Sequence, residues 1–160
     1  LAFEKFKTET NSDFQLLIVG RKAWNFQEVE ETHAQMKFKQ EVKFLGHVPP
    51  DELGEIVASA FAIAYISLFE GFGIPIVEAM SCNVPVITSN ITSMPEAAGE
   101  AALLVNPNYV EEISSAMKKM LDDNVRNLLI EKGKLQAKKF SWDLTADSLW
   151  KCCERVLNNK

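Results

Sequence analysis

Five short apolar runs, separated by longer polar stretches, are the clearest feature of the hydrophobic pattern. None of them alternates apolar with polar positions, as a strand with one solvent-exposed face would. Continuous apolar runs of this length are typical of strands that are buried on both faces of a parallel sheet. The pattern therefore predicts five strands, at residues 14–20, 42–46, 61–68, 84–89 and 101–105.

Helix-like stretches separate these runs. Pro50 and the acids that follow it mark one helix start, and Asn108 with Glu111 three residues later has the pattern of a capping pair for another. Ser141 is placed to cap the last helix, which carries an apolar stripe. The expected helices cover residues 26–39, 49–60, 74–82, 94–99, 108–121, 124–138 and 141 onward.

Strands that alternate with helices specify a parallel sheet covered on both faces. The predicted fold class is therefore α/β: a Rossmann-like open parallel sheet of five strands with helices on both faces, in one domain of 160 residues. Ligands on such a sheet bind at the carboxyl ends of the strands, where strand leads into helix. The stretch "EGFGIP", residues 70–75, occupies such a place.

Composition and charge narrow the possible functions. The formal net charge of -5 argues against binding to nucleic acid or to an anionic membrane surface. No apolar run approaches the roughly 20 residues that are needed to span a bilayer. The 3 cysteines lack C-x-x-C spacing and the 2 histidines stand alone, so we expect no metal site and a reduced, cytoplasmic setting. Trp24, Trp142 and Trp150 are expected to be packing residues.

The stretch "FEGFGIPIVE", residues 69–78, places a carboxylate at each end of a glycine-rich turn. Gly71 and Gly73 allow a tight turn and let a ligand approach backbone N–H groups closely. Pro75 favours the start of a helix, and a helix N-terminus suits a phosphate. Glu70 and Glu78 are natural acceptors for hydroxyl pairs such as a ribose or sugar diol. Spacing alone leaves open a simple turn with both acids in solvent, but a phosphate cradle flanked by two diol acceptors describes a nucleotide-sugar site.

The segment "SLFEGFGIPIVEAMSCNVPVITSNITSMPEAAGEAALLV", residues 67–105, closely resembles the donor-binding half of the retaining GT-B glycosyltransferases of glycosyltransferase family four (group 1). The signature of these enzymes is E-x7-E, which Glu70 and Glu78 meet. The resemblance continues in "VKFLGHVPPDEL" and in "FSWD", so it covers nearly the whole chain. It implies the C-terminal half of a GT-B fold. It also implies transfer of a sugar, with retention, from a GDP- or UDP-linked donor to an acceptor hydroxyl, with no cofactor and no protein-bound metal.

The resemblance also implies roles for individual residues. Glu78 would bind the ribose hydroxyls, and Glu70 would lie beside the transferred sugar as the catalytic carboxylate. Backbone amides of the loop would meet the sugar hydroxyls and the distal phosphate. The amides concerned belong to Phe72, Gly73 and Ile74. A second group, at the ends of two other strands, would border the base and phosphates: Gly20, Gly46 and His47.

Two parts of the family pattern are missing from this sequence. The donor domain of the family usually begins with a strand, a glycine turn and an Arg/Lys pair that neutralises the diphosphate, and Arg21 and Lys22 are not at the matching place. We therefore expect a single nucleotide-sugar-binding domain, residues 1–160, that is truncated at its N-terminal edge and lacks the acceptor-binding N-terminal domain. That domain would bring a glycan or lipid-linked acceptor. The isolated chain is expected to transfer nothing, and the full-length enzyme to work in the cytoplasm, including the inner face of the membrane.

Other functions remain open at the level of sequence. A glycoside hydrolase also uses two carboxylates, but it has no need for a glycine loop and helix start that suit a phosphate. A nucleotide-sugar binding module without transfer activity would keep the same loop, and only product formation separates it from an enzyme. A structural α/β domain would show no nucleotide affinity.

Overall fold

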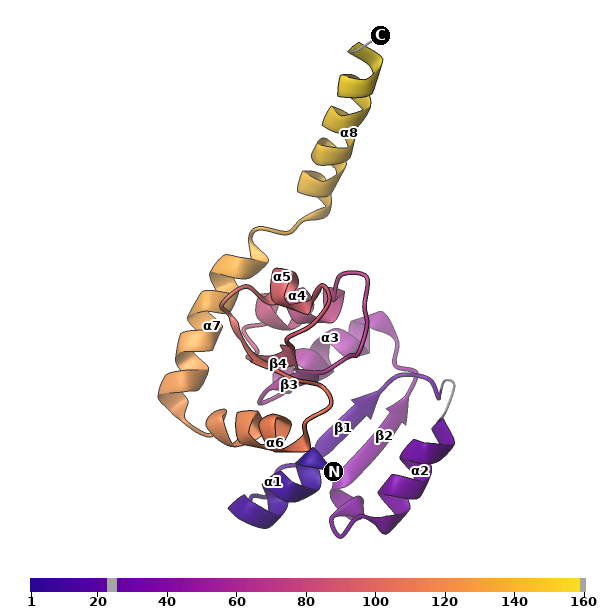
Figure 1. Cartoon of the computed structure of the whole chain (residues 1–160), viewed down its shortest axis with the longest axis vertical. Coiled ribbons are helices and arrows are strands. Elements are labelled where there is room, and N and C mark those ends of the chain that lie inside the picture. The colour runs from indigo at the N-terminus through magenta and orange to yellow at the C-terminus, as the bar shows by residue number, and fades with distance from the viewer. Residues whose placement is uncertain (23–25, 159–160) are drawn as a thin grey trace.

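The structure is a computed structural model that describes residues 1–22 and 26–158. Helices and strands alternate along most of the chain, and a long helix projects from the body at the C-terminal end (Figure 1). The elements, in chain order, are α1 (Ala2–Thr10), β1 (Leu16–Val19), α2 (Phe26–Gln35), a 3-10 helix (Lys39–Glu41), β2 (Val42–Gly46), α3 (Pro50–Ser59), β3 (Ile63–Tyr65), α4 (Ile74–Ser81), β4 (Val86–Ser89), α5 (Met94–Ala98), β5 (Ala102–Val105), α6 (Val110–Lys119), α7 (Asp123–Ala137) and α8 (Trp142–Asn158).

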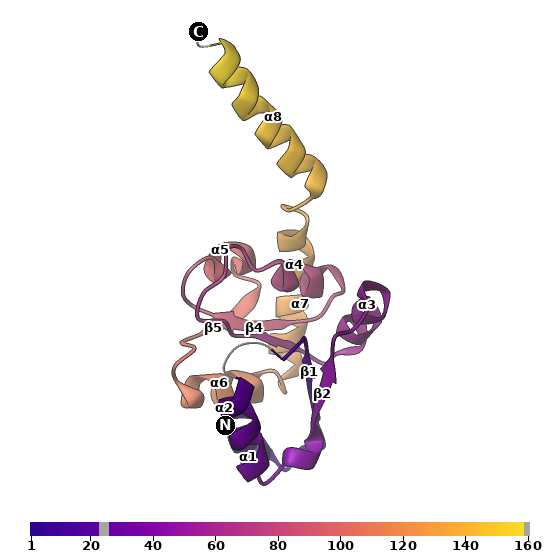
Figure 2. The ribbon, with the colours of Figure 1, turned by 90° about the vertical axis from the view of Figure 1, so that its right-hand side faces the viewer.

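All five predicted strands are present, and every strand pair is parallel. The α/β fold class with parallel strands and flanking helices is thereby confirmed. The prediction of one continuous sheet is wrong, because β1 pairs with β2 in one sheet and β3, β4 and β5 form a second sheet in that order. Figure 2 shows the two sheets running in different directions.

The topology gives the reason for this division. A doubly wound sheet grows outward from its centre in both directions, so the strands before and after the switch point lie on opposite sides of a central strand. Here β1 and β2 correspond to one side, and β3, β4 and β5 to the other. No strand in the described residues occupies the position between β1 and β3.

The sheet of β3, β4 and β5 is covered on both faces, which explains why its strands are mostly apolar and carry no charged residue. All four residues of β4 are buried. Val86 packs against α4 and α5, while the next residue, Ile87, packs on the opposite face against α6 and α7. Figure 2 shows α5 and α6 on opposite sides of this sheet. Burial on alternate faces removes the need for polar positions along the strand.

A separate core forms under β1 and β2. Phe3 and Phe6 of α1 pack with Met36 and Val42, and partly buried residues of β1 and β2 complete the cluster. The α1 helix also contacts α6. It therefore links the first sheet to the helices that cover the second sheet.

Two local predictions about helix starts had different outcomes. The Ser141 cap is confirmed, because the backbone N–H of Leu144 donates to Ser141 Oγ at 3.1 Å. The Asn108–Glu111 capping pair is wrong. The N-cap of α6 is Tyr109, which makes no side-chain cap bond, and the neighbouring acid Glu112 instead accepts from the backbone N–H of Asn106 at 2.8 Å.

The last helix, α8, has no buried residue and extends away from the body (Figures 1 and 2). Trp142 is 80% exposed and Trp150 is 67% exposed. The prediction that these two tryptophans are packing residues is therefore wrong. Trp24 lies outside the described residues. Among the helices that the structure describes, none combines the length and the apolar character that a bilayer crossing requires.

Candidate functional site

The segment between β3 and α4, residues 66–73, carries the first of the two predicted acids. Glu70 is half-buried in this loop. Its carboxylate oxygen Oε1 accepts a hydrogen bond from Ser67 Oγ at 3.0 Å, and its backbone carbonyl accepts one from Ser93 Oγ at 2.9 Å. Both the side chain and the backbone of Glu70 are therefore held by serine hydroxyls.

The loop ends at Gly73, the N-cap of α4, in a left-handed conformation with φ 100° and ψ 46°. A Cβ at this position would lie 3.1 Å from Ile76 Cδ1 and 3.3 Å from Met94 Sδ, so both the backbone and the packing require glycine. Gly71 does not have a positive φ, and a Cβ added there would meet no atom within 4 Å. Of the two glycines in the turn, only Gly73 is needed for the conformation.

Replacing Gly73 with alanine is expected to lower the free energy of unfolding by about 1–2 kcal/mol, the usual cost of a left-handed backbone for an L-residue. The same substitution at Gly71 should change it by less than about 0.5 kcal/mol, since most surface substitutions stay within that limit. Urea denaturation of the purified protein measures both values. Equal effects at the two positions would show that the left-handed turn at Gly73 is not required.

The N-terminus of α4 presents free backbone donors. Within the described residues, the backbone N–H groups of Phe72, Gly73 and Ile74 have no hydrogen-bond partner. The first helical bond at this end runs from the N–H of Ile76 to the Gly73 carbonyl at 3.0 Å. Unpaired N–H groups at a helix start favour an anionic group. The side chain of Phe72 points elsewhere, because its ring packs edge-on against Phe140 with 5.2 Å between centroids.

Tyr65, the last residue of β3, connects the two predicted acids electrostatically. Burial raises the pKa of the Tyr65 hydroxyl, and a hydrogen bond to the Glu70 carboxylate and the charge of Glu78 raise it further. The hydroxyl thus lies in the field of both carboxylates. Glu78 itself is exposed in α4, about one turn from Gly73. Helical side chains generally lean toward the helix N-terminus, so we expect the Glu78 carboxylate to point toward the end of α4 that carries the loop.

The remaining predicted residues lie at the ends of β1 and β2. The backbone N–H of Gly20 donates to the Gly46 carbonyl at 2.8 Å, and both glycines have positive φ values of 136° and 70°. His47 follows them and is exposed. No hydrogen bond or ion pair within the described residues joins these three to Glu70 or Glu78. The structure therefore groups the predicted residues into two sets, one at the end of each sheet.

Basic side chains make no ion pair or hydrogen bond with the loop in the described part of the chain. Lys22 forms an ion pair with Glu30, and its ammonium lies 4.9 Å from the centre of the Phe26 ring. No lysine or arginine forms an ion pair or a hydrogen bond with residues 66–78 among those the structure describes. Nor do the described residues contain a group of three or more His, Cys, Asp or Glu side chains placed to hold a metal ion.

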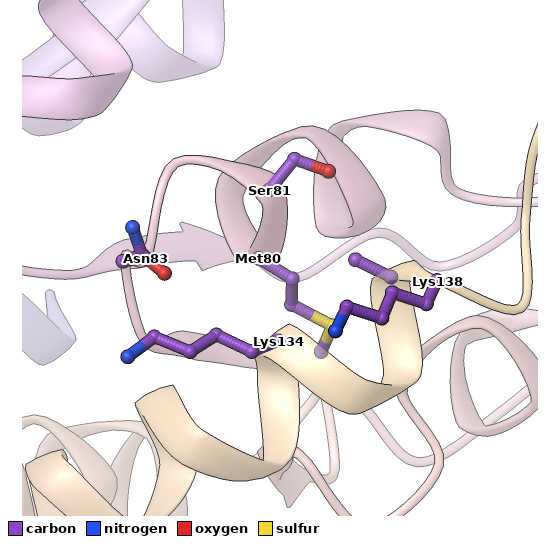
Figure 3. Close-up of a pocket in the computed structure, with 6 residues that line it drawn as sticks. Met80, Ser81, Asn83, Lys134 and Lys138 are labelled. Atoms are coloured by element: carbon purple, nitrogen blue, oxygen red, sulfur yellow. The ribbon is translucent and has the colours of Figure 1, made fainter.

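A cavity of about 320 Å³ lies at the other end of α4. Figure 3 shows Lys134 of α7 and Lys138, the residue after α7, extending beside Met80, Ser81 and Asn83, where α4 ends and the chain turns toward β4. This cavity is separated from the Gly73 loop by the length of α4. It contains none of the residues predicted from the sequence.

Three residues that contact Glu70 in the structure were not predicted from the sequence: Tyr65, Ser67 and Ser93. The signal that could have found Tyr65 and Ser67 is their position at the end of a strand next to Glu70. Ser93 is 23 residues from Glu70 along the chain, and only the folded structure brings it to the loop.

Comparison with known protein families identifies the family of this chain. A family model described as "Glycosyl transferases group 1" matches residues 1–136. The chain belongs to the group 1 glycosyltransferases. Its fold is the C-terminal half of a GT-B glycosyltransferase, as the resemblance in the sequence implied.

Two curated relatives illustrate the range of this group 1 glycosyltransferase family. The chain is 37% identical over 143 residues to O-antigen chain mannosyltransferase B of Escherichia coli, a match that covers 89% of this chain and 38% of that protein. It is 34% identical over 118 residues to D-inositol 3-phosphate glycosyltransferase of Corynebacterium jeikeium, covering 72% of this chain and 28% of that protein. The chain thus spans well under half the length of these relatives.

Solved structures share the fold of this group 1 domain. Sucrose-phosphate synthase from Thermosynechococcus elongatus aligns over 99% of this chain and 42% of that chain, with a TM-score of 0.84 and 21% identity. Anabaena HepE, solved in complex with UDP and glucose, aligns over 96% of this chain and 44% of that chain, with a TM-score of 0.80 and 21% identity. The C-terminal domain of a group 1 family protein from Francisella tularensis aligns over 86% of this chain and 76% of that domain, with a TM-score of 0.73 and 20% identity.

Proposed function

We propose that this chain is the donor-binding domain of a retaining glycosyltransferase of family four. In this proposal it holds a nucleotide diphosphate sugar, and the whole protein moves the sugar to an acceptor hydroxyl. The observation that carries the proposal is the turn from Glu70 into α4, where the backbone N–H groups of Phe72, Gly73 and Ile74 have no partner in the described residues and a carboxylate lies beside them. The family match to the group 1 glycosyltransferases supports this function. The site supports it as well, because two carboxylates that can accept from hydroxyls lie near a helix end that suits an anion.

The free backbone N–H groups of Phe72, Gly73 and Ile74 are proposed to bind the distal phosphate and sugar hydroxyls. Hydrogen bonds to a charged phosphate are roughly twice as strong as those between neutral groups, and the dipole of α4 adds to them. Because the Phe72 ring is held by Phe140, the loop presents its backbone rather than this side chain. An anion bound here satisfies donors that otherwise have no partner in the described residues.

The two carboxylates are proposed to accept hydrogen bonds from two different hydroxyl pairs. Glu78 is exposed and fixed in direction by α4, so it suits the ribose hydroxyls of the nucleotide. Glu70 lies earlier in the loop, where serine hydroxyls hold it, and it suits the hydroxyls of the transferred sugar. Gly20, Gly46 and His47 are proposed to border the base and phosphates from the end of the other sheet.

These positions suggest how the reaction is assisted. Positive charge develops at the anomeric carbon as the bond to the phosphate breaks, and the Glu70 carboxylate would stabilise it. Negative charge develops on the leaving phosphate, and the amides at the start of α4 would stabilise that charge. Both groups are fixed before the reaction, so little reorganisation is needed. We propose that this transfer proceeds with retention and without a protein-bound metal or cofactor.

The donor is proposed to be a GDP- or UDP-linked sugar. A mannosyl donor is favoured because the O-antigen chain mannosyltransferases of Escherichia coli and Salmonella typhimurium are 37% and 35% identical to this chain. The solved complex of HepE with UDP and glucose supports a nucleotide diphosphate in this fold. A glycan or lipid-linked acceptor, and action in the cytoplasm or at the inner face of the membrane, complete the proposal.

We further propose that the whole protein contains more than the described fold. Within the described residues β1 and β3 each pair on one side only, and one additional parallel strand between them would join the two sheets. In this proposal that strand also brings the basic pair that neutralises the diphosphate, as the resemblance to the family implies. An acceptor-binding N-terminal domain would complete the enzyme. The 160-residue chain by itself should therefore bind nucleoside diphosphates weakly and transfer nothing.

Replacing Glu78 with alanine is expected to weaken binding of nucleoside diphosphates by about ten- to a hundredfold. The change removes a charged acceptor for two ribose hydroxyls, and a hydrogen bond to a charged group contributes roughly 1.5–3 kcal/mol. Calorimetric titration with GDP and UDP measures the affinities. Glu131, an exposed acid on α7, provides the matched control, and Glu131→Ala should leave both affinities unchanged. If Glu78→Ala binds both nucleotides as tightly as the unchanged protein, Glu78 does not bind the ribose.

A further inference from the structure

The segment that carries Glu70 begins where backbone pairing in the sheet ends. Tyr65 is the last residue of β3 in register with β4, where it lies opposite Thr88. From residue 66 to residue 73 the chain belongs to neither a strand nor a helix. Backbone carbonyls in such a segment need other hydrogen-bond donors when they are close to the core.

Side-chain hydroxyls provide these donors. Thr88 Oγ1 donates to the Tyr65 carbonyl at 2.7 Å, and Ser89 Oγ donates to the Ser67 carbonyl. Ser93 Oγ donates to the Glu70 carbonyl at 2.9 Å. Three hydroxyls from β4 and the residue before α5 thus continue the connection between β4 and the loop beyond the last paired residue.

Because these hydroxyls are buried, each of them needs its hydrogen bond to a loop carbonyl. Thr88 and Ser89 are both 0% exposed. A hydroxyl has a single proton to donate, and a buried hydroxyl without a partner is unfavourable. Their protons are committed to the Tyr65 and Ser67 carbonyls, so the backbone of the loop is fixed relative to β4.

The last contact reaches the Glu70 side chain. Ser67, whose carbonyl is held by Ser89, donates its own hydroxyl to Glu70 Oε1 at 3.0 Å. Ser93 fixes the Glu70 carbonyl from the other side. The carboxylate is therefore anchored twice, once through the backbone and once through one of its own oxygens.

We propose that Ser67 and Ser93 are positioning residues for the Glu70 carboxylate, and that Thr88 and Ser89 hold the loop on which they act. This inference rests on the proposed role of Glu70 beside the transferred sugar. A carboxylate that stabilises a developing charge must be held in place before the reaction, and a displacement of about 1 Å can reduce the rate by about a hundredfold. Neither serine contacts the donor in this proposal, so their effect is on turnover rather than on nucleotide binding.

The test uses the full-length protein that contains this chain, with Ser67→Ala and Ser93→Ala as variants. We expect kcat to fall by about ten- to a hundredfold in each variant, within the range for a displaced catalytic group. The affinity for free nucleoside diphosphate should stay within about threefold, since in this proposal it depends on Glu78 and the loop amides and not on Glu70. The conservative variants Ser67→Thr and Ser93→Thr keep a hydroxyl and should recover most of the lost turnover.

Ser114 provides the control, because it is a 0% exposed serine whose hydroxyl has no partner in the described residues. Ser114→Ala should leave kcat unchanged. Alanine variants of Ser67 and Ser93 that keep full turnover would overturn the inference, provided that Glu70→Gln is inactive. Threonine variants that fail to restore turnover, or alanine variants that lose nucleotide affinity and turnover together, would also overturn it. If Glu70→Gln itself keeps full turnover, the proposed function of Glu70 fails instead.

Discussion

Glu70→Gln is expected to reduce turnover of the full-length enzyme by roughly a hundred- to thousandfold, comparable to the loss of one group that stabilises the charge of a transition state. Glutamine keeps the shape of the side chain and an acceptor for the Ser67 hydroxyl, but it removes the negative charge. In the proposed reaction, that charge stabilises the positive charge that develops on the sugar. Affinity for free nucleoside diphosphate should change by less than about threefold, because the proposed partner of Glu70 is the sugar and not the nucleotide. Product release from a nucleotide sugar, together with calorimetry on the free nucleotide, measures both quantities.

The control for this experiment is Glu131→Gln, which removes a charge from an exposed position on α7. It should leave kcat and nucleotide affinity unchanged. Comparison with Glu78→Ala separates the roles of the two acids, because that variant should lose nucleotide affinity first. Equal losses of free-nucleotide affinity in Glu70→Gln and Glu78→Ala would show that the assigned roles are wrong.

Ile76→Ala is expected to lower the free energy of unfolding by about 2–5 kcal/mol, as large-to-small changes at fully buried positions do. Ile76 is 0% exposed and packs in the cluster formed by α4, α5 and the sheet. It also lies against Gly73, so the cavity would open directly beneath the candidate site. Since domains are stable by only about 5–15 kcal/mol, the loss is a large part of the total. Urea denaturation and thermal melting of the purified protein measure it.

Ile74, two residues earlier in the same helix, is the matched control. It is 48% exposed, so Ile74→Ala removes much less buried apolar surface. Its effect on the free energy of unfolding should stay below about 1 kcal/mol, close to the range for surface substitutions. A loss as large as that of Ile76→Ala would mean that both faces of α4 are packed.

Strands and helix ends could be predicted from the sequence where local interactions decide them. The run at 84–89 contains β4 (Val86–Ser89), because a strand buried on both faces carries uncharged residues at successive positions, here Val86 and Ile87 followed by two small hydroxyl residues. Ser141 caps α8 through a bond to a residue three positions away. The glycine turn before α4 was also predictable, because Gly73 and Pro75 have conformational preferences that act within the turn itself.

Other local patterns were overruled by nearby alternatives. Asn108 and Glu111 have the spacing of a capping pair, but Asn106 accepts from the backbone N–H of Asn108 at 3.0 Å and Glu112 accepts from that of Asn106. Several polar groups compete for the same few donors at a helix start, and their sequence spacing does not decide which geometry wins. Gly71 and Gly73 look equivalent in the sequence, yet only the second adopts a positive φ.

The sequence by itself determined the α/β class, the parallel strands, and the resemblance that points to Glu70 and Glu78. Only the tertiary structure decided that β1 and β2 form a sheet apart from β3, β4 and β5, since strand partners depend on contacts between distant segments. It alone brought Ser93 to the Glu70 carbonyl across 23 residues, and it left Trp142 and Trp150 exposed on α8. The physical reason is the same in each case. Apolar pattern and turn chemistry act within a few residues, whereas pairing, burial and the direction of a hydroxyl depend on which segments meet when the chain folds.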